Sequence, residues 1–87
     1  MRLPGEDLIS AGLDDLASGA ESVPALLVSI GTPRLRELGI KIEAPFSDPE
    51  HRLYRLLAAS HGNAAHSKYN ALVRRLVSFE RALACAR

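Results

Sequence analysis

Glu80 is the residue of this sequence whose placement most suggests chemistry. At 100° per residue along a helix, Glu80 projects into an apolar arc between Leu76 and Leu83. A carboxylate in such surroundings needs a charged partner or an elevated pKa. We expect an ion pair with an arginine of a neighbouring helix or of a second subunit, and Arg52 and Arg55 are the nearest candidates in sequence order. A general acid or base is the other interpretation, but no second inward carboxylate stands at helical spacing to complete an acid/base pair.

The histidines and the single cysteine form no metal-binding or nucleophilic pattern. His61 and His66 are separated by five residues across an expected turn, whereas two imidazoles share a helix face at i, i+4 spacing. No carboxylate or cysteine completes a metal-ligand set with the histidines, and Cys85 alone cannot form an internal disulfide. The sequence also has no G-x-S-x-G motif and no glycine-rich phosphate loop. We therefore expect no catalytic residue, no cofactor and no metal.

Charge divides the sequence more sharply than its overall value of +1 suggests. Residues 1–50 contain four basic and nine acidic residues, a net charge of −5, and residues 51–87 contain seven basic residues and Glu80 alone, a net charge of +6. Such asymmetry can mark a nucleic-acid-binding half. We favour two complementary surfaces that meet within one chain or across a dimer, because the basic half offers few aromatic side chains on which unpaired bases could stack.

Proline and glycine divide the N-terminal half into short predicted helices. The first covers about residues 5–18, with apolar residues on one face and acidic residues in its first turn. The second covers about residues 22–30 and ends at Gly31. Thr32 as N-cap and Pro33 in the first turn then predict a third, two-turn helix over residues 32–38.

The remaining chain predicts an extended segment and a helical hairpin. Residues 40–44 alternate apolar and polar side chains, so we expect a connector laid across the core or an edge that pairs with its copy in a dimer, and we favour the connector. Asp48 as N-cap and Pro49 predict a helix to about residue 60, and residues 61–63 a turn into a last helix over about 64–84. The expected fold is one all-α domain, residues 1–87, of about five helices ending in an antiparallel hairpin.

A small helical chain of this kind favours an interaction module over an enzyme. With 87 residues, the margin of stability is thin, and association often supplements it. We therefore predict a non-enzymatic interaction or regulatory module that forms a homodimer or binds another protein, with an apolar interface rimmed by charge pairs. The candidate interface residues are Arg52, Arg55, Tyr69, Arg74, Phe79 and Glu80.

Three other functions stay open at this stage. The first is a nucleic-acid-binding module, whose candidate phosphate contacts are Arg52, Arg55, Lys68, Arg74, Arg75 and Arg81. The second is a small hydrolase or nuclease centred on Glu80, His61 and Arg55. Membrane-surface binding ranks third, because the apolar helix faces are needed to fold the domain. The N-terminus turns acidic where a secretory signal would be apolar, so the expected location is the cytoplasm.

Overall fold

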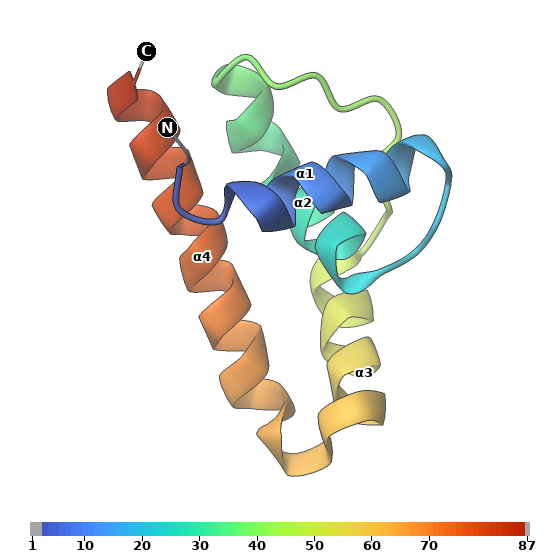
Figure 1. Ribbon diagram of the computed structural model, residues 1–87. Coiled ribbons are helices and arrows are strands. Elements are labelled where there is room, and N and C mark those ends of the chain that lie inside the picture. The colour runs from blue at the N-terminus through green and yellow to red at the C-terminus, as the bar shows by residue number, and fades with distance from the viewer. Residues whose placement is uncertain (1–2, 87) are drawn as a thin grey trace.

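The computed structural model describes residues 3–86, which form four α-helices and one 3-10 turn (Figure 1). The elements are α1 (Glu6–Ala17), α2 (Val23–Glu37), α3 (Pro49–His61), η1 (Gly62–Ala64) and α4 (Ala65–Ala86). The predicted all-α class is confirmed, and the described residues contain no strand. The predicted number of about five helices is wrong.

The count differs because α2 runs without interruption through the sequence that predicted a stop and a new start. Gly31 and Thr32 are buried inside α2, and Thr32 is not an N-cap: its hydroxyl donates to the backbone carbonyl of Val28 at 3.0 Å. Pro33 lies inside the helix, where a proline typically costs about 3 kcal/mol. Burial of the α2 leucines on both sides of Pro33 offsets this cost, at about 1.5–3 kcal/mol for each large apolar side chain.

α2 is the centre of the molecule, and α1 packs closely against it. Ala25, Leu26, Leu27, Val28 and Leu35 of α2 have no exposed surface. The close approach of α1 depends on Gly12, because a β-carbon there would lie 2.5 Å from Cγ2 of Val28 and would also clash with the carbonyl oxygen of Pro24. In Figure 1, α1 crosses in front of α2, and the chain leading into it meets α4. One side of α2 is therefore covered by α1.

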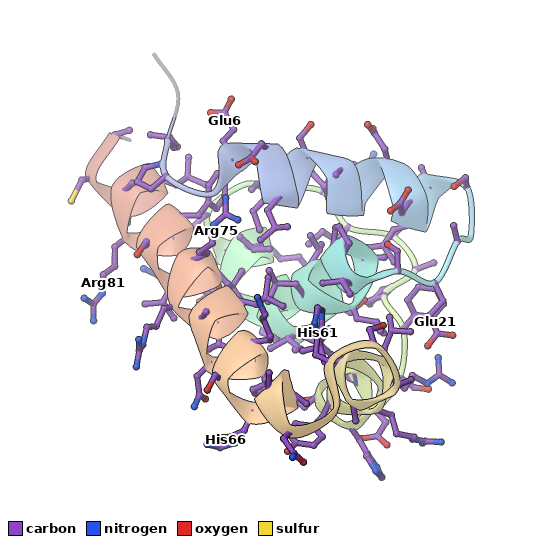
Figure 2. All side chains as sticks on the ribbon, turned by 60° about the horizontal axis from the view of Figure 1, so that its bottom comes forward. Glu6, Glu21, His61, His66, Arg75 and Arg81 are labelled. Atoms are coloured by element: carbon purple, nitrogen blue, oxygen red, sulfur yellow. The ribbon has the colours of Figure 1, made fainter. Side chains whose placement is uncertain are left out.

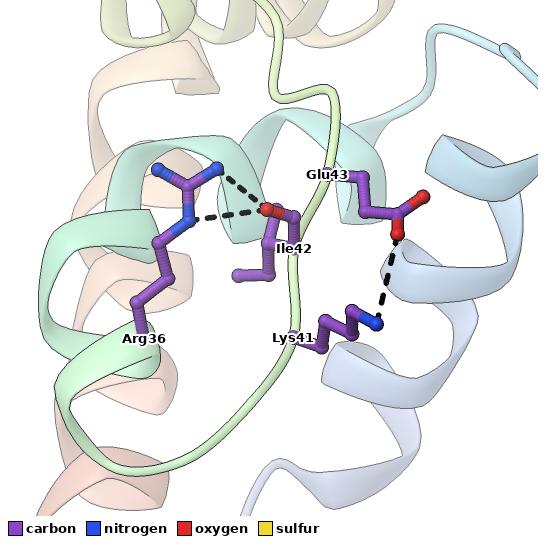
Figure 3. Close-up of polar contacts among 4 residues, drawn as sticks. All are labelled: Arg36, Lys41, Ile42 and Glu43. Carbon is purple, nitrogen blue, oxygen red and sulfur yellow. Dashed lines mark hydrogen bonds and ion pairs between the residues drawn. The ribbon is translucent and has the colours of Figure 1, made fainter.

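Residues 38–48 return the chain from α2 to α3 as an extended connector. Ile42 is 5% exposed, and its carbonyl oxygen accepts hydrogen bonds from Nε and Nη2 of Arg36, at 3.1 and 2.5 Å (Figure 3). Further along, the backbone N–H of Phe46 donates to Oγ of Ser29 at 3.0 Å. These bonds anchor the connector to α2 at two points, as the favoured sequence interpretation expects.

α3 and α4 form the predicted hairpin on the other side of α2. The turn passes through η1, where Gly62 has a φ of 55° that favours glycine. Leu53 and Leu57 of α3 and Leu76 and Phe79 of α4 are buried in the core. Asp48 precedes α3 as predicted, but its side chain caps no backbone N–H, and it adopts a left-handed conformation with φ 49°.

Candidate functional site

Four apolar side chains of the hairpin lie together at its surface, and we call them the uncovered face: Tyr54, Tyr69, Val73 and Val77. The rings of Tyr54 on α3 and Tyr69 on α4 are in contact, with centroids 6.0 Å apart at 57°. Val73 and Val77 follow Tyr69 on α4 at intervals of four residues, so they extend the same edge of the helix. Tyr54 is 40% exposed and Val77 36%, the only large hydrophobic side chains of residues 3–86 in the exposed class.

The uncovered face lies on the opposite side of α4 from α1. Arg75 marks the α1 side, since its Nη2 lies 3.1 Å from Oδ1 of Asp7. Its backbone carbonyl oxygen is also close to Gly5, where a β-carbon would lie 3.0 Å away. Val77 is two residues further along, which turns its side chain about 200° around the helix. No helix of the described chain remains to cover that side.

Glu80 lies beside this face and packs on the backbone of α2. A β-carbon at Gly31 would lie 3.1 Å from Oε2 of Glu80 and 2.8 Å from Cδ1 of Leu76, so α4 approaches α2 closely at this glycine. Burial raises the pKa of the Glu80 carboxyl, and the positive charge of Arg34 opposes that rise in part. The expected ion pair of Glu80 with Arg52 or Arg55 does not form among residues 3–86; Glu80 instead has an elevated pKa, and the arginine whose charge acts on it is Arg34 of α2.

The carboxylate of Glu50 on α3 also acts on the uncovered face. Burial raises the pKa of the Tyr69 hydroxyl, and the negative charge of Glu50 raises it further. Glu50 on α3 and Glu80 on α4 therefore border the uncovered face, and the exposed Arg74 and Arg81 lie three and four residues from Val77 on α4. The apolar side chains are bordered by groups of both signs.

The six candidate interface residues do not form one surface. Tyr69 belongs to the uncovered face and Glu80 borders it. Phe79 is only 5% exposed and packs in the core, so it is unavailable on this chain's surface. Arg52 places its guanidinium 5.7 Å from the ring centroid of Phe46, on a different side of α3 from Tyr54. Arg74 is exposed on α4 three residues before Val77, whereas Arg55 is exposed on α3.

Sequence reasoning missed Tyr54 and Val77 as surface residues. Both occur at positions that a helical projection assigns to the margin of an apolar arc. The arc on α4 is wide enough to touch two neighbours, and no pattern in the sequence says which margin a neighbour will cover. The sequence offered one signal, which is that the apolar arc of α4 is broader than contact with a single neighbouring helix requires.

The candidate phosphate contacts are divided between helices. Arg52 and Arg55 lie on α3, and the other four lie on α4. Arg75 is engaged by Asp7, whereas Arg81 extends away from the body of the molecule (Figure 2). Because Arg75 and Arg81 point to different sides of α4, the basic residues do not line a single track for a phosphate backbone.

The proposed catalytic trio is likewise not assembled. His61 is exposed at the end of α3, Glu80 packs at Gly31, and Arg55 faces a separate hollow beside Glu21. Residues 3–86 contain no group of three or more His, Cys, Asp or Glu side chains placed to hold a metal ion. Within the same residues, each helix is too short or too polar to cross a lipid bilayer.

An ion pair joins the acidic and basic halves at the surface of the molecule. Arg75–Asp7 is the one arginine–carboxylate ion pair that joins them among residues 3–86, and both side chains are about half exposed or more. The pairs Arg34–Glu37 and Lys41–Glu43 are local and lie within the acidic half. Arg75–Asp7 therefore links the two halves at a position where water screens the attraction.

Comparison with known proteins finds no matching family model, no similar curated protein and no similar solved structure. The functional argument therefore depends on the surfaces described above.

Proposed function

We propose that this protein is a non-enzymatic interaction module that forms a homodimer through the uncovered face. The observation that carries the proposal is the exposure of Tyr54 and Val77 on a side of the hairpin that no helix covers. Tyrosine is enriched at protein interfaces because its ring buries a large apolar area while its hydroxyl keeps a polar partner. A second chain on this face would remove both residues from water.

The charges around the face support a second copy as the partner. In a two-fold symmetric interface, the same patch meets itself, so it must be complementary to its own charges. The uncovered face is bordered by the acidic residues Glu50 and Glu80 and by the basic residues Arg74 and Arg81, which are three residues before and four residues after Val77 on α4. A patch with both signs at its border can form charge pairs with its own copy, whereas a border of one sign would repel it.

Dimerisation would also supply stability that a chain of 87 residues lacks. Burial of apolar surface stabilises by roughly 25 cal/mol per Å². Within the chain, α1 already buries the apolar surface on one side of α2 and α4. A second copy would bury the apolar surface on the opposite side and so stabilise the fold further.

The direct test is the native mass of the purified chain, measured by light scattering over a concentration series at low and high salt. We expect a dimer that persists at high salt, because apolar contact is not screened by ions. The rim charges should make association moderately weaker as salt rises. A monomer at every concentration and both salt levels would overturn the proposal.

A further inference from the structure

A second surface, on the other side of α3, has the features of a small-molecule site. An open hollow of about 440 Å³ lies between the loop that joins α1 to α2 and the outer side of α3. This volume is within the range of about 300–1,000 Å³ that is common for small-molecule sites. Its lining residues are Glu21, Arg52, Arg55, Leu56 and Ala59.

Two arginines of α3 face this hollow together. Arg52 and Arg55 are three residues apart, so their side chains leave the same side of the helix. Neither guanidinium forms an ion pair with any residue of the described chain. Guanidinium groups bind carboxylate and phosphate oxygens through paired hydrogen bonds, and they keep their charge at any physiological pH.

Arg52 is held in place before any ligand arrives. Its guanidinium carbon lies 5.7 Å from the centroid of the Phe46 ring, and Phe46 is fixed in turn by the hydrogen bond from its backbone N–H to Ser29. A side chain already restrained by an aromatic ring loses less conformational freedom on binding. Arg52 is therefore the preorganised cation of the hollow, and Arg55 is the exposed cation beside it.

The remaining lining residues restrict what can bind. Leu56 is half-buried and Ala59 has a short side chain, so the α3 wall beside the arginines is apolar and leaves room for a carbon skeleton. Glu21 supplies a negative charge on the loop side and forms no ion pair with either arginine. Its repulsion weakens the binding of a bare anion and favours a ligand that also presents a hydrogen-bond donor.

We propose that this hollow binds a small organic oxyanion, a carboxylate or a phosphate, with its anionic group on Arg52 and Arg55. The carbon skeleton of the ligand lies on Leu56 and Ala59. This site is on a different side of α3 from Tyr54 and does not depend on the proposed dimer. Its occupancy and the oligomeric state can therefore fail or succeed separately.

The test is a titration of the ¹⁵N-labelled chain, followed by NMR through the backbone amides of α3 and the Nε–H groups of Arg52 and Arg55. The probes are glycerol 3-phosphate and glycerate in separate arms; both carry hydroxyl donors, and they distinguish a phosphate site from a carboxylate site. We expect at least one probe to give saturable shifts at these residues, with a Kd on the order of 1 mM or tighter. Shifts that stay linear with both probes, or that spread over all arginines, would overturn the proposal.

Four variants separate a formed site from general attraction of anions to a basic surface. Arg55→Gln should weaken binding about fivefold or more, because it removes a charged donor. Glu21→Gln should strengthen it about twofold, because it removes the opposing charge. Ala59→Phe should abolish binding with no change in charge, and Arg81→Gln on α4 should change nothing. Since Ala59 is exposed, its replacement is compatible with folding, which circular dichroism verifies.

The Ala59→Phe variant decides the outcome. If it binds as tightly as the natural chain while Arg55→Gln binds more weakly, the anion is attracted by charge alone and the hollow is not a site. If Arg81→Gln weakens binding as much as Arg55→Gln, the same conclusion follows.

Discussion

The side of α2 and α4 that α1 covers differs from the opposite side in two respects. One is how closely a neighbouring helix approaches, and the other is how much apolar surface stays exposed. On the α1 side, Gly12 allows helix backbones to meet, and Asp7 pairs with Arg75. Where α4 packs on α2, a β-carbon at Gly31 would meet only side chains, and Val77 on the outer side of α4 remains 36% exposed. The described chain therefore completes its packing on one side alone. The other side keeps apolar surface that a partner can bury.

The largest expected effect is at Gly12, because its neighbours are backbone atoms that cannot move aside. Gly12→Ala places a methyl group against the Pro24 carbonyl and Val28, and α1 must separate from α2. We expect a loss of about 2 kcal/mol in the free energy of unfolding, measured by urea denaturation. Ala11→Ser, at the exposed neighbouring position, should stay within about 0.5 kcal/mol of the natural chain. An unchanged midpoint for Gly12→Ala would contradict the close packing of the α1 side.

Gly31→Ala should be far milder, although Gly31 is also buried. A methyl group here meets Cδ1 of Leu76 at 2.8 Å and Oε2 of Glu80 at 3.1 Å, and both belong to side chains that can rotate toward the uncovered face. The higher helix propensity of alanine offsets the remaining strain by about 1 kcal/mol. We expect a net change within about 1 kcal/mol by the same denaturation method. A loss as large as that of Gly12→Ala would mean that both sides are equally rigid.

Glu80 makes the stability of the uncovered side depend on pH. Its folded-state pKa is raised above the ordinary value of 4.5, so the folded chain binds the proton more tightly than the unfolded chain. Stability from this group is therefore complete below about pH 4.5 and is lost as pH rises through the folded pKa. The Glu80→Gln variant has no carboxyl group at this position, so its stability does not fall in this way as pH rises. We expect its Tm to exceed that of the natural chain increasingly between pH 4.5 and 7, and a lower Tm at pH 7 would show that Arg34 outweighs burial.

The smallest expected effect is at the ion pair between α1 and α4. Asp7 and Arg75 are 65% and 49% exposed, so water screens their attraction. In a double-mutant cycle with Asp7→Asn and Arg75→Gln, we expect a coupling of about 0.2–1 kcal/mol that falls as salt is added. A larger coupling that resists salt would mean that charge, rather than the glycine contact, holds α1 in place.

The sequence predicted the all-α class, the hairpin and the connector because each has a local signal. Periodicity indicated α4, Pro49 indicated the start of α3, and alternation indicated residues 40–44. The same local rules failed at Pro33, where burial along α2 outweighs the cost of a proline within a helix. A glycine or proline that would end a helix has little effect when the residues before and after it are buried in the same core.

The candidate site was less predictable than the fold, since it depends on which helix lies beside which. The elevated pKa of Glu80 follows from its place in an apolar arc, but its neighbour Arg34 follows only from the packing of α4 on α2. Phe79 and Val77 are two residues apart in one arc, and tertiary packing buries the first and exposes the second. A projection of a single helix cannot make that distinction.

The most direct measurement of the central claim is the native mass of a matched pair of variants, Val77→Glu and Ser78→Glu, by light scattering. Both place the same charge on neighbouring exposed positions of α4, but only Val77 belongs to the uncovered face. We predict that Ser78→Glu remains a dimer like the natural chain, while Val77→Glu is a folded monomer at the same concentration. Equal dimerisation of both variants would contradict the assignment of the uncovered face as the interface.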